Sequence, residues 1–363
     1  MACIPPATDE ILLKNMEQEF TWAVKTLRNH PSIVLWAGDN EVDEMNAIYH
    51  MRLGKNKITR QLIPEILGRH DNSRPYLPSS PYIPDELFES YPADVFVERH
   101  LWGARDYYKA DFYKLSKAHF VSEVGYHGCP SPDSVRRIVD EDCVYPIFNE
   151  QWSLHSSDQR GQMHRVNLMM DQVNQLFGFC PATIDDFSLA SQISQGEAMK
   201  FFVERVRIRK PYTSGVIWWN LLDGWPQMSD AVVDYFFQKK LAYTYLKRSQ
   251  EPFVVMIDEM RDWCYCPVAS NDTLDSICFD LKIYDIDSNQ ILYQNSATIA
   301  PNSNLRLDGI RMHYHEQRFL VLEWLVNEKR FYNHYLCGMP AFDFAQYQIW
   351  LEKYQKITNG RAV

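Results

Sequence analysis

The spacing of apolar residues changes once along this 363-residue chain, near residue 250. Upstream, short apolar runs such as 33–36 (IVLW) and 215–219 (GVIWW) alternate with longer stretches whose apolar residues recur every three or four positions. A run without alternation is typical of a strand buried on both faces, and a three-to-four period is typical of a helix. This part therefore predicts an α/β arrangement with parallel strands.

The number of apolar runs decides whether this α/β part has enough strands to form a closed barrel. Strands are expected at 33–36, 74–81, 94–97, 119–122 and 215–219, and helices at 8–29, 43–68, 106–117, 158–178, 185–209 and 235–247. A closed (β/α)₈ TIM barrel needs eight strands over about 250 residues. We therefore expect residues 1–250 to be an N-terminally truncated TIM barrel with about strands four to eight, to which residues 1–5 would add the end of one more. The alternative is a fold that is not a closed barrel.

Downstream of residue 250 the apolar period becomes two. Apolar and polar residues alternate over 277–284, a turn is expected at 287–289, and segments 319–326 and 331–336 have the pattern of a further hairpin. We expect residues 251–363 to form a small immunoglobulin-like β-sandwich that ends in a short helix at 341–357.

Composition excludes several classes of protein. The net charge of −10 argues against a nucleic acid or an anionic membrane as partner. The chain contains no run of about 18 apolar residues, and its opening, MACIPPATDE, lacks the regions of a signal peptide, so none is expected here. The compartment of the intact protein stays open between periplasmic, secreted and lysosomal. Eight irregularly spaced cysteines indicate small buried side chains rather than a metal site.

Two glutamates directly follow expected strands. Glu41 ends the cluster AGDNE after residue 36, and Glu123 follows the strand at 119–122. The C-terminal ends of strands form the active-site face of an α/β barrel, and two facing carboxylates suffice for glycoside hydrolysis. The surplus of aromatic residues (10 Trp, 21 Tyr and 19 Phe) also suits a sugar site, because a ring can stack on the apolar face of a pyranose. The alternative is that both glutamates only cap helices.

Three strings carry a family resemblance. HPSIVLWAGDNE at 30–41, SEVGYHGCPS at 122–131 and GVIWWNLLDGWP at 215–226 resemble motifs of glycoside hydrolase family 2, and within it the β-mannosidase branch. Segments 74–82 and 331–340 resemble the same branch. The resemblance implies a retaining, exo-acting enzyme whose barrel follows two N-terminal β-domains, which agrees with the strands missing from the count.

The resemblance also implies roles for individual residues. Glu41 is expected to be the general acid/base and Glu123 the nucleophile, with Asn40 binding the 2-hydroxyl of the sugar. Further substrate contacts are expected from the sixth- and eighth-strand motifs, at Trp102, Trp219, Asp223 and Trp225. Asp223 has the alternative of anchoring its own loop. Asp39 departs from the family, where an asparagine is common, and its carboxylate either raises the pKa of Glu41 or points away.

The sequence thus predicts a retaining exo-β-glycosidase, best read as a β-mannosidase that removes terminal β-D-mannosyl residues from oligosaccharides or glycoconjugates without metal or organic cofactor. The alternatives are another family 2 specificity, β-galactosidase or β-glucuronidase, and a non-catalytic glycan-binding protein. The isolated chain is expected to be weakly active or inactive, because five or six strands cannot close the barrel. The sequence leaves the oligomeric state open.

Overall fold

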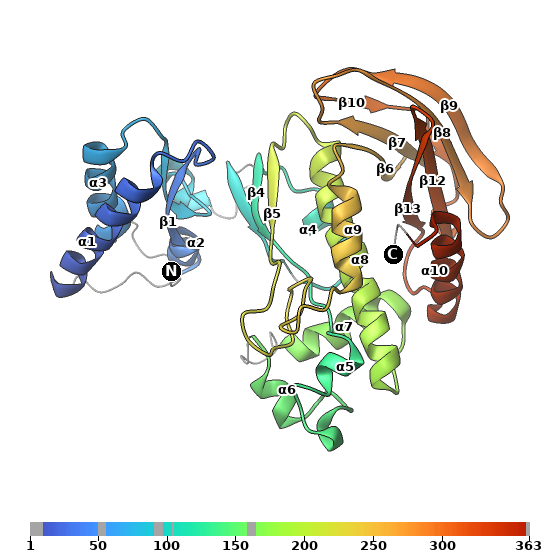
Figure 1. Ribbon diagram of the computed structural model, residues 1–363, viewed down its shortest axis with the longest axis horizontal. Helices are drawn as coiled ribbons and strands as arrows, with labels where there is room; N and C mark the ends of the chain where they lie inside the picture. Colours follow the sequence, from blue (N-terminus) through green and yellow to red (C-terminus); the bar gives the residue numbers. More distant parts are fainter. Residues whose placement is uncertain (1–9, 50–55, 91–96, 104, 158–164, 361–363) are drawn as a thin grey trace. The chain divides into compact units, whose positions relative to one another are not determined.

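The chain forms two compact units. The computed structural model describes residues 10–49, 56–90, 97–103, 105–157 and 165–360 (Figure 1). The first unit comprises Met1–Leu101 and Ser116–Glu123, and the second comprises Trp102–Leu115 and Val124–Val363. In the described part of the chain, no helix combines the length and the apolar character that a membrane crossing requires.

Helices of the first unit bury a small apolar core. Helix α1 (Glu10–Leu27) packs on α3 (Ile63–His70), which continues a π-helical turn at Ile58–Leu62. Their shared core is made of Val24, Ile58, Ile63, Ile66 and Leu67. The helix expected at 8–29 is thus found over its described part, and its expected cap at Thr8 lies outside the described residues. Helix α2 (Val42–Ile48) and a 3₁₀ helix at Asp85–Ser90 complete the helical segments described here.

Strands β1 (Trp36–Asn40) and β2 (Tyr76–Ser80) run parallel, with Trp36 opposite Tyr76 and Asn40 opposite Ser80. The expected strand at 33–36 was placed wrongly, because Val34 is 74% exposed and pairing begins only at Trp36. The strand instead runs through the polar cluster. Polar residues are tolerated in this strand because the buried carboxylate of Asp39 accepts hydrogen bonds, and because the backbone of β1 pairs with β2.

Strands β3 (Glu98–Leu101) and β4 (Phe120–Val124) are hydrogen-bonded neighbours. The Glu98 carboxylate ties β3 to the end of β2, because it accepts hydrogen bonds from Ser80 Oγ at 3.2 Å and from the Tyr82 amide at 3.0 Å. Residues 94–96 of the strand expected at 94–97 lie outside the described residues. Glu123 lies within β4 rather than after it, so the expected strand end was two residues short.

The second unit contains most of the helices. Before the sandwich they are α4 (Asp111–Lys114), α5 (Pro132–Val135), a 3₁₀ helix at Glu141–Cys143, α6 (Glu150–Leu154), α7 (Arg165–Phe177), α8 (Ile184–Ile208) and α9 (Leu241–Ser249), with strand β5 (Gly215–Trp218) between α8 and α9. Thr183 caps α8 by accepting a hydrogen bond from the Asp186 amide at 3.2 Å. Helix α8 is buried along most of its length because it packs on α7, α9 and the sandwich.

Two expected helices are shorter than their sequence pattern. The helix expected at 106–117 is reduced to α4, and the one expected at 235–247 begins only at Leu241. In the second case the carboxylate of Asp234 accepts hydrogen bonds from the amides of Phe236 and Gln238, both at 2.9 Å. This side chain holds residues 234–238 in a loop, because it offers the backbone an alternative to helical hydrogen bonds.

A β-sandwich follows α9, as expected. One sheet contains β6 (Phe253–Arg261), β7 (Cys264–Asn271), β10 (Ser303–Arg306) and β11 (Ile310–Arg311), and the other has the order β13 (Lys329–Cys337), β12 (Arg318–Val326), β8 (Ile277–Asp285) and β9 (Ile291–Ile299). Both sheets contribute to one core that includes Val254, Val268, Ile283 and Leu322. Helix α10 (Phe344–Thr358) follows, at the expected tail helix. The chain is thus an α/β region followed by a sandwich.

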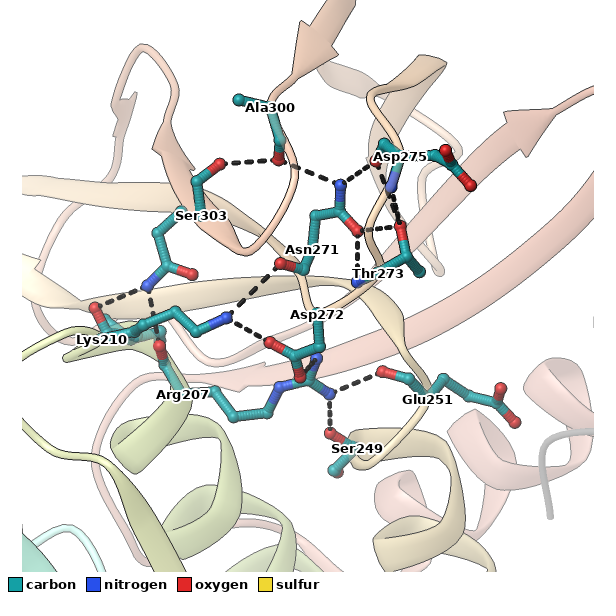
Figure 2. Close-up of polar contacts among 12 residues, drawn as sticks. Arg207, Lys210, Ser249, Glu251, Asn271, Asp272, Thr273, Asp275, Ala300 and Ser303 are labelled. Carbon is teal, nitrogen blue, oxygen red and sulfur yellow. Dashed lines mark hydrogen bonds and ion pairs between the residues drawn. The ribbon is translucent and has the colours of Figure 1, made fainter.

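Polar contacts join the end of α8 to the sandwich (Figure 2). Asp272, just after β7, accepts a hydrogen bond from Arg207 at 2.8 Å and pairs with Lys210. Arg207 also donates to the Ser249 and Glu251 carbonyl groups, at 2.6 and 2.7 Å. These bonds fix the helical region on the sandwich where α8 ends.

Candidate active site

Glu41 occupies a strained turn at the end of β1. Its amide donates to the Ser80 carbonyl group at 2.8 Å, and its carbonyl group accepts from the Met45 amide at 2.9 Å, which starts α2. The backbone of Glu41 is left-handed, with φ 61° and ψ 11°. This conformation is uncommon for a residue with a side chain, and such strain is concentrated at functional positions. The strand-to-helix turn therefore fixes where the carboxylate of Glu41 projects.

His100 connects the two glutamates that the sequence singled out. Its Nδ1 lies 2.9 Å from Oε1 of Glu41 and 3.0 Å from Oε2 of Glu123. Its Nε2 lies 3.2 Å from Oγ of Ser80. The ring is deeply buried, with 3% of its side chain exposed, whereas the two carboxylates remain partly accessible, at 18% and 14%. Strands β1, β3 and β4 thus bring three titratable groups to one point.

The charge of His100 is set by its two neighbours. Burial lowers the pKa of the imidazole, but the hydrogen bonds and negative charges of Glu123 and Glu41 outweigh it and raise the pKa to about 9. His100 is therefore a cation at neutral pH. It offsets part of the repulsion between two carboxylates that would otherwise face each other closely.

The same cluster has the donor set that a metal ion would need. One atom each of Glu41, His100 and Glu123 lie within 4.8 Å of one another. Carboxylate oxygens and an imidazole nitrogen are ordinary ligands of divalent cations. Here, however, the imidazole nitrogen contacts both carboxylates, so its positive charge and its hydrogen bond already serve the two oxygens.

Asp39 and Asn40, which precede Glu41 in the sequence, have different surroundings. The buried Asp39 carboxylate accepts hydrogen bonds from Nδ2 of Asn56 and Oγ1 of Thr59, both at 2.9 Å. These bonds hold Asp39 among residues 56–59. Asn40 is the last residue of β1 and lies opposite Ser80, whose hydroxyl group contacts His100.

The other expected substrate contacts belong to the second unit. Trp219 and Trp225 are 47% and 42% exposed, and the ring of Trp225 stacks on His155 with centroids 5.9 Å apart. The guanidinium of Arg105 lies 4.3 Å from the ring centroid of Trp102. Sugar binding by these tryptophans stays a prediction.

Asp223 is almost fully buried and holds its own loop. Its Oδ1 accepts hydrogen bonds from Gln227 at 2.8 Å and from Ser229 at 2.5 Å. Burial raises the pKa of Asp223 above its usual range, although Lys240 and these two donors act in the opposite direction. The contacts support the anchoring alternative for Asp223.

Sequence reasoning did not select His100. The residue lies inside β3, two positions before the expected contact Trp102, and a single histidine in a strand gives no catalytic pattern. The one available signal was its position near the end of a strand, because neighbouring strands there carry Glu41 and Glu123.

Relatives with known names match most of the chain. It is 26% identical to Beta-mannosidase B of Thermothelomyces thermophilus over 333 residues, which cover 80% of this chain and 38% of the relative. It is also 26% identical to Beta-mannosidase of Bos taurus over 304 residues, 74% of this chain and 33% of the relative. The chain therefore spans between about a third and two fifths of the length of these relatives. No family model matches it.

Solved structures share its fold. Beta-D-mannosidase from Dictyoglomus thermophilum aligns with a TM-score of 0.80 and 24% identity over 93% of this chain and 42% of that one. The exo-chitosanase CsxA of Amycolatopsis orientalis aligns with a TM-score of 0.66 and 17% identity over 92% of this chain and 40% of that one. Together with the named relatives, these define the class as that of the glycoside hydrolases. The resemblance expected from the motifs is confirmed at this level: the chain is similar to β-mannosidases in sequence and in fold.

Proposed function

We propose that this chain carries the catalytic glutamates of a retaining exo-β-glycosidase, and specifically of a β-mannosidase acting on terminal β-D-mannosyl residues of oligosaccharides or glycoconjugates. The observation that carries the proposal is the cluster in which oxygens of Glu41 and Glu123 lie within 4.8 Å of each other and share one imidazole. Retaining glycosidases use carboxyl groups about 5–5.5 Å apart, whereas inverting ones leave about 6.5–9.5 Å for a water molecule. The close spacing supports retention.

In this mechanism Glu41 first takes up a proton from solvent. Glu123, as a carboxylate, then attacks the anomeric carbon while Glu41 gives that proton to the departing oxygen. The bond to the leaving group breaks, and an ester forms between the sugar and Glu123. Glu41, now ionised, removes a proton from water, and the water oxygen displaces Glu123 from the same carbon. Two inversions give net retention.

We propose further residues as substrate contacts, namely Asn40, Trp102, Trp219, Asp223 and Trp225. For Asp223 the alternative is that it only anchors its own loop.

We further propose that residues 1–250 correspond to the later strands of a (β/α)₈ barrel, with the sandwich domain at 251–363. Five strands before residue 250 and a sandwich after it, within the described residues, support this assignment. The placement of Glu41 at the end of β1 and of Glu123 near the end of β4 is that of barrel active sites.

The sugar is tested with 4-nitrophenyl β-D-mannoside beside the matching galactoside, glucuronide and glucosaminide, using both residues 1–363 and a version extended upstream. Cleavage of the mannoside at least about tenfold above the others, measured as kcat/KM, is expected in the extended version. Preference for another sugar would reassign the specificity within the family. Sugar binding without turnover in both versions would favour the non-catalytic alternative.

The roles are tested by variants of the active version. Glu123→Gln should abolish turnover of every substrate. Glu41→Ala should spare aryl mannosides with good leaving groups far more than poor ones, and azide should restore its activity, because an activated leaving group needs little protonation. A 2-deoxy-2-fluoro-mannosyl fluoride should label Glu123, identified by mass spectrometry of the peptide. Equal loss on both substrate types, with label on another residue, would show that the roles are wrong.

A further inference from the structure

A hollow in the second unit is lined by helix α9 and the hairpin of β12 and β13. Its volume is about 400 Å³, within the range of small-molecule sites. Helix α9 forms one wall, with the exposed Lys247 and the half-buried Tyr243, and the hairpin of β12 and β13 forms the other, with Trp324, Lys329 and Phe331. We refer to this hollow as the α9–β13 groove.

The groove is basic in a chain that is acidic as a whole. Its lining contains five lysine or arginine residues and one carboxylate, Glu251, whereas the whole chain carries a net charge of −10. Arg248 is hydrogen-bonded to His334, and Arg330 pairs with Glu323. Within the described part of the chain, Lys239, Lys247 and Lys329 have no carboxylate at ion-pair distance. Three cations thus face the groove without an internal counter-ion.

Aromatic rings lie among these cations. The ammonium of Lys239 lies 4.6 Å from the ring centroid of Tyr243, and that of Lys329 lies 5.3 Å from the centroid of Phe331. Phe331 in turn stacks on Trp324, with an angle of 12° between the rings. Trp324 is 1% exposed, and among the described residues its indole N–H has no hydrogen-bond acceptor. Trp324 belongs to the core of the sandwich, so the stack joins the wall of the groove to that core.

From these features we propose that the α9–β13 groove binds an acidic oligosaccharide, meaning a sugar that carries carboxylate or sulfate groups. Lysines supply charge and hydrogen-bond donors for the anionic substituents, and the half-buried ring of Tyr243 supplies a flat apolar surface for a pyranose face. An acidic peptide would satisfy the lysines but has no such flat apolar face for the ring. The groove shares no residue with the glutamate cluster, and the proposal does not rest on the function proposed above.

Binding is tested by calorimetry on the full chain with a hyaluronan tetrasaccharide, which carries carboxylates, and a chondroitin sulfate tetrasaccharide, which adds sulfates. Chitotetraose serves as the neutral sugar and hexaglutamate as the acidic peptide. One site per chain is expected for the acidic sugars, with affinity at least about tenfold above that for chitotetraose. Their affinity should also fall as salt rises, because salt screens exposed charges.

Variants place the binding in the groove. Lys247→Ala combined with Lys329→Ala should weaken the acidic sugars about tenfold, whereas Lys356→Ala, at an exposed position of α10, should leave them unchanged. Tyr243→Ala should weaken binding and Tyr243→Phe should retain it, because the phenyl ring keeps the stacking surface. Circular dichroism checks the fold of each variant.

Four outcomes would overturn the proposal. They are no binding of either acidic sugar up to about 5 mM, equal binding of chitotetraose, equal or tighter binding of hexaglutamate, and unchanged affinity in the double lysine variant. The third outcome would mean that the groove recognises acidic peptide.

Discussion

Nδ1 of His100 lies 3.0 Å from Oε2 of Glu123, and the same nitrogen also contacts Glu41. An imidazole nitrogen carries at most one hydrogen, so the two carboxylates share a single donor. In a double displacement, the free negative charge would move from Glu123 before attack to Glu41 afterwards. Because both carboxylates contact the same nitrogen, His100 can donate its hydrogen to whichever carboxylate is negatively charged, and its ring does not have to move.

The first prediction concerns the protonation of His100. Because its pKa is raised to about 9 from 6.5, the imidazole should stay protonated through neutral pH. NMR titration of the histidine ring signals should show one ring that titrates near pH 9 and disappears in His100→Gln. A His100 ring that titrates near 6.5 would contradict the charge assigned to the cluster.

The same shift predicts how stability depends on pH. Because folding raises the pKa of His100, the protonated imidazole stabilises the folded state. This contribution is complete below pH 6.5 and is lost as the pH rises through about 9. Urea unfolding of the wild type should therefore show a loss of up to about 3 kcal/mol between these pH values. His100→Gln should lack that loss, whereas His119→Gln, at an exposed position before β4, should keep it.

A further prediction separates the contributions of the two glutamates. Glu41→Gln and Glu123→Gln each remove one negative charge beside His100, so each should lower the pKa of the imidazole towards its ordinary value. The NMR titration above measures the change without any need for activity. Glu65→Gln, an exposed position on α3, is the matched control and should change nothing.

Gly125, directly after β4, is predicted to be required for packing. A Cβ atom there would lie 2.6 Å from the ring of Trp102 and 2.7 Å from the backbone oxygen of Trp219. Gly125→Ala should therefore destabilise the fold by about 1–3 kcal/mol. Gly68→Ala is the contrast, because its Cβ would meet nothing within 4 Å inside α3, and it should stabilise by about 0.5–1 kcal/mol. Equal effects in thermal unfolding would refute this reading.

Asn271, at the end of β7, gives the last prediction (Figure 2). Its Nδ2 donates to the carbonyl groups of Asp275 at 2.8 Å and Ala300 at 3.0 Å, while its Oδ1 accepts from the Thr273 amide at 2.9 Å. Asn271→Asp keeps the shape but turns an oxygen towards two carbonyl oxygens inside a buried site. We expect a loss of about 2–4 kcal/mol in the free energy of unfolding. Asp275→Asn should cost far less, because Asp275 contributes its backbone here. A neutral Asn271→Asp would show that these bonds carry little stability.

The two glutamates could be predicted from the sequence because the residues that point to them are their neighbours along the chain. Glu41 and Glu123 each lie within a few residues of an apolar run, inside strings that resemble one family. The sandwich was equally accessible, because alternation over 277–284 needs only the two-residue period of a strand with one buried face. Strand β1 was misplaced because the apolar character of Val34 does not reveal that the side chain is exposed.

The sequence by itself determined the class of fold and the resemblance to β-mannosidases, and it singled out the pair of carboxylates, since periodicity and contiguous motifs are properties of neighbouring residues. Tertiary structure alone decided that His100 joins the pair, that Asp39 bonds to Asn56 and Thr59, and that Gly125 leaves room for Trp102. Each of these depends on which strands and loops become neighbours. Atoms that meet across 59 positions of sequence, as Glu41 and His100 do, leave no periodic trace along the chain.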